Sequence, residues 1–213
     1  MAVPSPQSPV PSPQSLFSRL TMKSELPIIT SDRLLLRIGI QEDIPKILKY
    51  FIDNKAFLTP FYPRWAESFF TAEYWHYQLE NNFLEFIHDQ SLKLFIFPKK
   101  HPTKVIGTIN FNNFIRGAAH FCHVGYSLAE AEQGKGYMTE GLQAATQYVF
   151  EELNFHRIMA NYMPHNQRSG NVLKRLGFVV EGYARDYLLI DGKWQDHILT
   201  SLINPHWQQN NEE

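Results

Sequence analysis

The chain has 213 residues and a formal net charge of -1, from 20 basic and 21 acidic side chains. This balance offers no global electrostatic case for binding DNA or an anionic membrane. No apolar run reaches the roughly 18 to 20 residues that cross a bilayer. The one cysteine, Cys122, excludes an intrachain disulfide and fits a reducing compartment. The sequence therefore predicts a cytoplasmic protein without membrane or DNA partners.

Both ends of the chain differ from its centre. Residues 1–25 are rich in Pro, Ser and Gln, a composition typical of extended, unpacked chain. We predict a disordered tail there, either passive, which is favoured, or a proline-rich ligand for another protein. It has neither the basic start nor the apolar stretch of a secretory signal. Residues 26–207 are predicted to form one domain and residues 208–213 a second disordered tail. Translation could start at Met1 or Met22.

The first part of the domain alternates a strand, helices and an aromatic loop. An apolar run predicts a strand from Leu34 to about Ile40, and spacing of three and four predicts helices at Asp43–Tyr50 and Thr71–His88. The second helix should bury Phe83 on its inner face. The aromatic loop between the helices, residues 57–65, contains Phe57, Phe61, Tyr62 and Trp65, interrupted by Pro60 and Pro63. It is either a small satellite core or one wall of a substrate pocket.

The remaining elements predict a mixed α/β fold. Three closely spaced strands favour an antiparallel meander. A helix over Lys135–Leu153 then leads to a further strand, and this crossover indicates that the strands on either side of it are parallel neighbours. A short helix begins at Asn166 and ends at Gly177, and Asp191-Gly192 is a favoured hairpin turn. The strands are predicted at Leu92–Phe97, Lys104–Phe114, Ala118–Leu128, Arg157–Tyr162, Phe178–Ile190 and Trp194–Ile203.

The turn before the long helix is the most informative motif. It reads Gln133-Gly134-Lys135-Gly136-Tyr137-Met138. Two glycines let the backbone approach a ligand closely, and the free N–H groups of the first helical turn suit a phosphate or pyrophosphate. A P-loop would need Ser or Thr after Lys135, and a dinucleotide fingerprint would need a third glycine. A plain tight turn is the alternative.

In this context the residues resemble a known family. Gln133 and Gly136 match the Gln/Arg-x-x-Gly-x-Gly/Ala pattern of the GCN5-related N-acetyltransferases (GNAT), although Met138 departs from its last position. Gln-Gly-Lys-Gly-x-Met resembles the RimJ/RimL branch, which acetylates the N-termini of ribosomal proteins, and the later segments resemble its RimJ-type members. The other matching segments are Thr30–Arg37, His123–Ser127, His156–Tyr162, Asn166–Ser169, Leu176–Phe178 and Glu181–Gly192.

The resemblance implies an acyl-CoA N-acyltransferase fold, with a mostly antiparallel sheet and one parallel, splayed strand pair. Acetyl-CoA would be the cosubstrate. Its pantetheine arm would lie between the splayed strands, and Gly125 would mark either a bulge that frees an N–H or a site of close aromatic packing. The residues implied to bind the cosubstrate are Val124, Tyr126, Gln133, Gly134, Lys135, Gly136, Tyr137, Met138, Asn166 and Asn171.

Three residues are candidates for the chemistry, and no metal is expected. The resemblance places Ser169 as the acid that protonates the leaving thiolate, although a serine there can be purely structural. His123 is the candidate base and Asp186 the second choice; the base stays open because Leu188 stands where RimL-type relatives carry Glu. Cys122 should point away from His123 along the strand and be inert.

The leading hypothesis is transfer of acetyl from acetyl-CoA to the N-terminal α-amine of an Ala-starting small-subunit ribosomal protein, free or in a ribosome precursor. Phe61, Tyr62, Trp65 and the Tyr183–Tyr187 region would line the acceptor groove. The alternatives are acetylation of a small-molecule amine, or a non-catalytic acyl-CoA-binding module in ribosome assembly. The sequence leaves the oligomeric state open.

Overall fold

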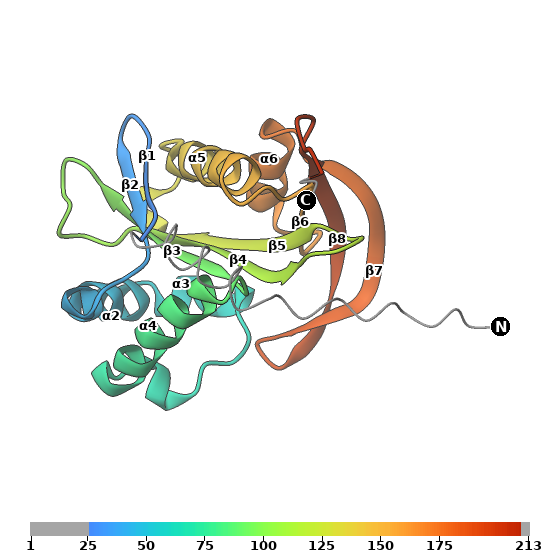
Figure 1. The fold of residues 1–213 in the computed structure, drawn as a ribbon. Coiled ribbons are helices and arrows are strands. Elements are labelled where there is room, and N and C mark those ends of the chain that lie inside the picture. Colours follow the sequence, from blue (N-terminus) through green and yellow to red (C-terminus); the bar gives the residue numbers. More distant parts are fainter. Residues whose placement is uncertain (1–25, 210–213) are drawn as a thin grey trace.

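A computed structural model describes residues 26–209, so the predicted tail at residues 1–25 and residues 210–213 lie outside it. The described chain forms an eight-stranded sheet in the order β1-β2-β3-β4-β5-β6-β8-β7 (Figure 1). Its strands are β1 Ile28–Thr30, β2 Leu34–Arg37, β3 Leu92–Pro98, β4 Gly107–Ile115, β5 Phe121–Leu128, β6 Arg157–Tyr162, β7 Val179–Ile190 and β8 Lys193–Ile203. Its helices are α2 Ile44–Asp53, α3 Lys55–Leu58, α4 Ala72–Ile87, α5 Tyr137–Glu151 and α6 Gln167–Arg175, with short 3-10 turns at Gln41–Asp43, Thr59–Phe61, Glu67–Phe70 and Glu130–Glu132.

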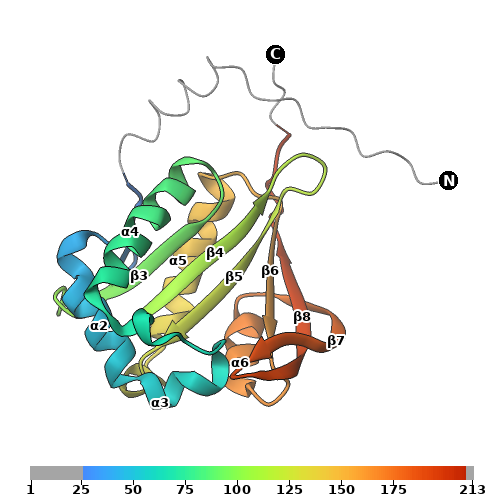
Figure 2. The ribbon, with the colours of Figure 1, turned by 90° about the horizontal axis from the view of Figure 1, so that it is seen from below.

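Helices cover both faces of the sheet. Helices α5 and α6 lie on one face, and α2, α3 and α4 lie on the other (Figures 1 and 2). The α5 face is an aliphatic core in which Leu142, Ala145 and Val149 of α5 are fully buried. The α2–α4 face is an aromatic core that includes Phe51 and Trp75. Burying each large apolar side chain contributes about 1.5–3 kcal/mol, so both faces hold the sheet in place.

The predicted meander and crossover are confirmed. Strands β3, β4 and β5 pair antiparallel, and β5 pairs parallel with β6. Strand β1 was not predicted, because three residues carry too little pattern.

In α4, Phe83 is 42% exposed and Asn82 is buried instead, so the predicted inner position of Phe83 is wrong. The inward stripe of α4 runs through Leu79, Asn82 and Phe86 at spacings of three and four, which turns Phe83 toward solvent.

The parallel pair separates partway along. Pairing between β5 and β6 runs only from Phe121↔Arg157 to Val124↔Ala160. Beyond that point β5 stays paired with β4 as far as Leu128, while β6 stays paired with β8 as far as Tyr162. Each strand therefore follows its outer neighbour, and the two facing edges splay apart. The predicted splayed pair is confirmed, and it leaves backbone groups on both edges without a strand partner.

Gly125 lies at the start of the splay, and both predictions for it are wrong. The β4–β5 register is regular from Asn112↔His123 to Gly107↔Leu128, and the irregularity lies instead between Asn112 and Ile115. A Cβ built on Gly125 would meet no atom within 4 Å, so no aromatic ring packs there. The outer neighbour β4 keeps the strand straight, and Gly125 instead leaves open space beside the splay.

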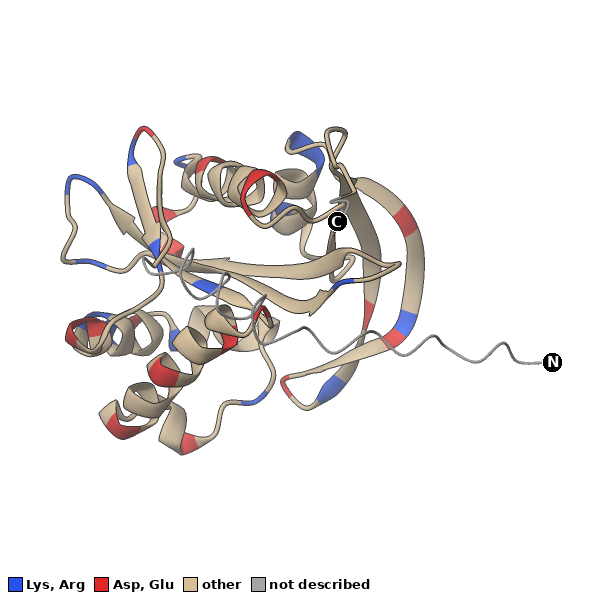
Figure 3. Ribbon diagram, viewed as in Figure 1, with Lys and Arg blue, Asp and Glu red and all other residues tan. Residues whose placement is uncertain are grey.

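Charged residues of both signs occur throughout the described chain. Basic and acidic residues are interspersed on both sides of the sheet (Figure 3), in keeping with the net charge of -1. Among residues 26–209, no helix combines the length and the hydropathy needed to cross a membrane.

One buried ion pair fixes the start of α2 to the sheet. The Asp43 side chain is fully buried and accepts from Arg37 Nη1 at 2.5 Å, from Arg37 Nη2 at 3.0 Å and from the Ile40 N–H at 3.1 Å. Lys46 adds a contact at 2.8 Å. Burial alone would raise the pKa of Asp43, but the hydrogen bonds from Arg37 and Lys46 outweigh it and lower the pKa.

We expect Asp43 to contribute acid-sensitive stability. Because its folded-state pKa lies below its unfolded value, its contribution is present above about pH 4 and is lost as pH falls through the folded pKa. Asp43→Asn should lower the free energy of unfolding by about 3 kcal/mol at pH 7, since it breaks a buried pair. Urea titrations at pH 7 and pH 3 would measure both effects. A variant whose stability deficit is the same at both pH values would contradict this assignment.

Candidate active site at the splayed strands

The turn before α5 has the backbone of an anion-binding site. Gly134 and Gly136 have φ angles of 74° and 79°, in the left-handed region that favours glycine, and Gly136 caps the helix. The first backbone bond into the helix is donated by Glu140 to Gly136 at 3.0 Å. The N–H groups of residues 137–139 therefore have no partner from the helix itself and lie at its positive end.

Two arginines from distant segments surround this turn, and sequence reasoning missed both. Arg33 donates to the Lys135 carbonyl at 3.0 Å and lies over the Tyr137 ring at 4.6 Å. It also pairs with Glu140 at 2.6 Å. Arg168 of α6 donates to Gln133 Oε1 at 2.7 Å. These contacts brace the turn, and Arg168, whose partner Gln133 is neutral, brings positive charge to it. No local motif identifies them, because they join residues 35 to 107 positions apart.

Ser169 lies beside the splay and is bonded to a strand residue. Its backbone N–H donates to Asn166 Oδ1 at 3.3 Å, so the predicted capping role of Asn166 is confirmed. The Ser169 hydroxyl lies 2.8 Å from the Tyr126 hydroxyl, which also donates to the Ser169 carbonyl at 3.1 Å. Burial strongly raises the pKa of Tyr126, so this phenol stays protonated. The resemblance implied only a backbone role for Tyr126, whereas its side chain adds a second hydroxyl group at the site. Asn171 is exposed on α6.

Alternation along β5 divides its side chains between the two faces of the sheet. Cys122, Val124 and Tyr126 pack on the α5 side. Cys122 is fully buried on the face opposite to His123, as predicted, and burial raises its thiol pKa. His123 projects to the opposite face. Its Nδ1 is buried without a hydrogen-bond partner among residues 26–209, and burial lowers its pKa, so the ring is neutral at neutral pH.

A cluster of hydroxyl groups joins the aromatic loop to the sheet. Ser127 is 7% exposed. Its Oγ lies 2.8 Å from Tyr50 Oη, 2.7 Å from Tyr62 Oη and 3.0 Å from Thr108 Oγ1. Burial raises the pKa of Tyr50 and of Tyr62, so both phenols remain protonated and neutral. The cluster holds Tyr62 over the splayed end of β5.

The aromatic pocket lies between this loop, α4 and the sheet. It has a volume of about 300 Å³, aromatic walls that include Tyr62 and Trp75, and a polar floor of Thr108, Asn110 and Asn112 from β4. Trp65 packs behind it, stacked on Phe69 with ring centroids 5.4 Å apart, and Phe61 lies against Phe57. The aromatic loop is therefore both a satellite core and, through Tyr62, a pocket wall.

The β7–β8 hairpin arches under the same face (Figure 1). Asp186, the second candidate base, lies on an exposed irregular stretch of β7 with a φ of 49°, and its N–H donates to Asp196 Oδ1 at 2.8 Å. Tyr183 donates to the same carboxylate. In the described chain Asp186 makes no hydrogen bond to Ser169 or to β5. His197, which the sequence did not single out, is 4% exposed and lies 5.6 Å from the Tyr187 ring.

The arrangement can therefore support transfer of a group between ligands on opposite faces of the sheet. The α5 turn, Ser169 and Tyr126 belong to one face, and His123, Ser127 and the aromatic pocket belong to the other. Within residues 26–209, no group of three or more His, Cys, Asp or Glu side chains could hold a metal ion. The chemistry available comes from hydroxyl groups, imidazole and unpaired backbone.

Comparison with known proteins agrees with this geometry. Residues 33–179 match the acetyltransferase (GNAT) domain model. The chain is 45% identical to the [ribosomal protein uS5]-alanine N-acetyltransferase of Escherichia coli K12, over 84% of this chain and 92% of that protein. It is 34% identical to the probable N-acetyltransferase YjcK of Bacillus subtilis, over 74% and 86% of the two chains.

Solved structures share the fold. The ribosomal-protein-S5-alanine acetyltransferase of Vibrio fischeri superimposes with a TM-score of 0.82 and 38% identity, covering 86% of this chain and all of that one. RimJ of Mycobacterium smegmatis, solved with a CoA-disulfide, has a TM-score of 0.77 at 24% identity, covers 86% and 89% of the two chains, and supports the fold alone. The chain therefore belongs to the GNAT family of acetyltransferases, for which acetyl-CoA is the cosubstrate.

Proposed function

We propose that this enzyme acetylates the N-terminal α-amine of an Ala-starting small-subunit ribosomal protein, in the cytoplasm. The observation that carries acetyl transfer is the break in β5–β6 pairing beside the glycine turn, with a pocket open on the opposite face. The choice of acceptor is supported by the 45% identical relative, whose name specifies the alanine of ribosomal protein uS5. That relative is matched over 92% of its length, so the likeness extends across the whole domain.

Acetyl-CoA would be held by the backbone around the splay. The turn of residues 133–138 offers free N–H groups and a helix N-terminus to the pyrophosphate, with Arg168 adding positive charge and Arg33, paired with Glu140, bracing the turn. The facing edges of β5 and β6 offer unpaired backbone to the pantetheine arm, through Val124 and Tyr126 in our assignment. Asn166, at the N-cap of α6, and the exposed Asn171 within the helix are further candidates for this contact.

Groups of the chain itself would then accept a proton from the amine, donate a proton to the leaving thiolate and stabilise the oxyanion of the tetrahedral intermediate. An α-amine has a pKa of about 7.7–8.0, so much of it is already neutral near pH 7.5 and the base has modest work. His123, neutral because of burial, would accept a proton on the acceptor face. Ser169, bonded to Tyr126, would donate a proton to the leaving thiolate on the other face. The unpaired backbone of β5 would bond the developing oxyanion.

The first prediction concerns the glycine turn. Gly136→Glu should raise the KM for acetyl-CoA at least about tenfold, equivalent to about 1.4 kcal/mol, because a carboxylate would stand where the pyrophosphate is expected. Gly117→Glu is the matched control. Gly117 also has a positive φ, 68°, and open space around its Cβ position, but it lies in the β4–β5 turn. Equal KM values for both variants and the parent would contradict the assignment.

The second prediction concerns the reaction and its acid. Incubation with acetyl-CoA and an Ala-starting peptide should add one acetyl group to the N-terminal amine, measured by mass spectrometry. Ser169→Ala should lower kcat by about 10²-fold while leaving acetyl-CoA binding intact, since general acid catalysis contributes on this scale. Activity on small amines but on no peptide would favour the small-molecule alternative. Cofactor binding without turnover on any amine would favour the non-catalytic module.

The third prediction concerns the base. If both His123 and the α-amine must be deprotonated, log kcat/KM should fall with a slope of two below the pKa of His123, which burial sets under its usual 6.5. His123→Gln should reduce the slope to one, leaving only the amine. His120→Gln is the control, because the Nδ1 of His120 is also buried without a hydrogen-bond partner in the described part of the chain and burial lowers its pKa too, but His120 precedes β5 at its far end. An unchanged slope in His123→Gln would exclude it as the base.

A further inference from the structure

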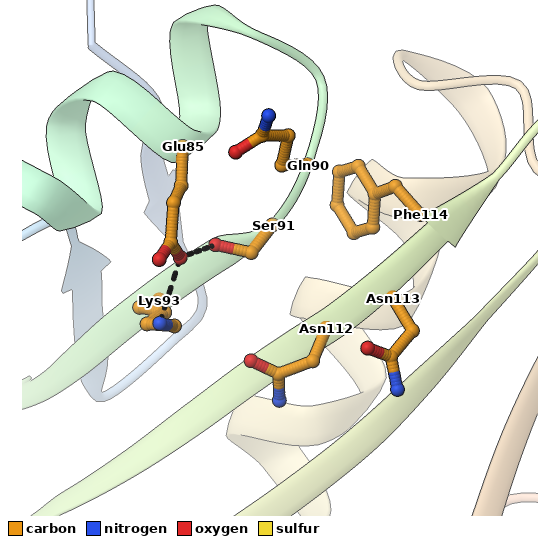
Figure 4. Close-up of a pocket in the computed structure, with 7 residues that line it drawn as sticks. All are labelled: Glu85, Gln90, Ser91, Lys93, Asn112, Asn113 and Phe114. Atoms are coloured by element: carbon orange, nitrogen blue, oxygen red, sulfur yellow. Dashed lines mark hydrogen bonds and ion pairs between the residues drawn. The ribbon is translucent and has the colours of Figure 1, made fainter.

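A second cavity continues from the aromatic pocket along the same face of the sheet. It has a volume of about 390 Å³ and is walled by the C-terminal end of α4, the start of β3 and the end of β4 (Figure 4). Glu85, Ser91 and Lys93 form one side, with Glu85 bonded to Ser91 at 2.6 Å and to Lys93 at 2.7 Å. Asn112 and Asn113 present their amides from β4, side by side (Figure 4). We call this cavity the polar groove.

The polar groove and the aromatic pocket are neighbours. They share two wall residues, Lys93 and Asn112. Asn112 is also the direct cross-strand partner of His123, so the junction lies beside the candidate base. From Thr108 at the splayed end to Asn112, β4 advances four residues, about 13 Å, which matches three or four residues of extended chain. A continuous track therefore leads from the splay to the far end of β4.

On the side away from the polar groove, contacts between the aromatic loop and the β7–β8 hairpin close off the aromatic pocket. At the tip of the β7–β8 hairpin, the Asp191 N–H donates to the Tyr62 carbonyl at 2.9 Å. Arg64 lies 3.8 Å from the Asp191 carboxylate. Its guanidinium also packs against Gly192, because a Cβ built on Gly192 would lie only 2.5 Å from Arg64 Cζ. Tyr62 is in turn held by Ser127. A polypeptide whose first residue reaches the splay thus meets the aromatic loop on one side and an open groove on the other.

The chemistry of the polar groove suits a polypeptide backbone. Side-chain amides both donate and accept, as backbone groups do, and the Gln90 and Asn113 amides make no hydrogen bond within residues 26–209. Glu85 and Lys93 neutralise each other, so the groove carries no net field that would select a charged side chain. Polar groups of this kind can recognise an extended chain whatever its sequence.

Resting on the proposed function, we propose that the polar groove binds the backbone of the acceptor polypeptide a few residues beyond its N-terminus. The acceptor's first residue lies at the splay, the next residues follow the floor of Thr108, Asn110 and Asn112, and the chain leaves the enzyme past Asn113 and Gln90. The groove therefore sets the affinity for long acceptors and leaves the chemical step unchanged.

The test compares an Ala-starting octapeptide with an Ala-starting dipeptide amide, using the full-length enzyme. The double variant Asn113→Gly and Gln90→Ala removes the two free amides; glycine suits Asn113 because its φ is 54°. We expect KM to rise about fivefold or more for the octapeptide and to stay unchanged for the dipeptide, with kcat unchanged for both. The control, Asn81→Ala with Gln143→Ala, removes two exposed amides from outer helix faces and should change neither KM.

A second variant provides an independent test. Since Cys122 is fully buried, Gln90→Cys supplies an accessible thiol that a bulky maleimide can label. In the labelled Gln90→Cys variant, the rate should no longer saturate with octapeptide concentration, whereas the KM for the dipeptide should stay unchanged. The same label on Gln143→Cys should change neither KM. Equal effects on both peptides, or none, would overturn the groove assignment. A parent enzyme that acetylates neither peptide would instead contradict the proposed function, so the two failures are distinguishable.

Discussion

The separation of β5 from β6 after Val124 and Ala160 is the constraint on which the site depends. Each strand remains paired with its outer neighbour, so the sheet stays intact while its centre opens. Backbone groups inside a protein need partners, and the opened edges offer a row of donors and acceptors to a ligand instead of to a strand. The helices that begin beside the opening, α5 and α6, add free N–H groups at their first turns. The opening is thus part of the backbone topology and needs no special side chain.

The two faces of the sheet contribute different chemistry because β5 alternates. Tyr126 contacts Ser169 on the α5 face, whereas His123 and Ser127 project to the face of α2–α4. A residue that protonates a leaving group and a residue that deprotonates an incoming amine can therefore stand on opposite sides of one strand. Aromatic rings and neutral phenols surround Ser127 on that second face. Burial of the His123 ring lowers its pKa and keeps it neutral on that face.

Local pattern predicted most of the fold. Periodicity located α2, α4 and α5 and the meander, the crossover rule placed β6 parallel to β5, and the glycines located the turn before α5. Helix α3, which overlaps the predicted aromatic loop, was missed because its four residues carry too little pattern. The failures share a cause. The local sequence predicts a bulge or close aromatic packing at Gly125, but the regular register with β4 excludes the first and the open space at its Cβ position excludes the second. Phe83 satisfied the apolar period, but the inward stripe of α4 passes through Asn82. Arg33, Arg168 and the Tyr126–Ser169 contact depend on segments far apart in sequence, and no local spacing encodes such contacts.

The hairpin tip shows how a distant contact can determine specificity. Strand β7 is an edge strand, and an isolated two-stranded arm gains little stability from its own pairing. The tip is nevertheless positioned, because the Asp191 N–H bonds the Tyr62 carbonyl while the Tyr62 hydroxyl bonds Ser127 of β5. Tyr62 therefore connects the β7–β8 arm, through its backbone carbonyl, to the sheet, through its hydroxyl group. With the arm fixed there, the acceptor face is bounded beside the splay and open toward the end of β4, and the direction in which an acceptor can extend follows from that one tyrosine.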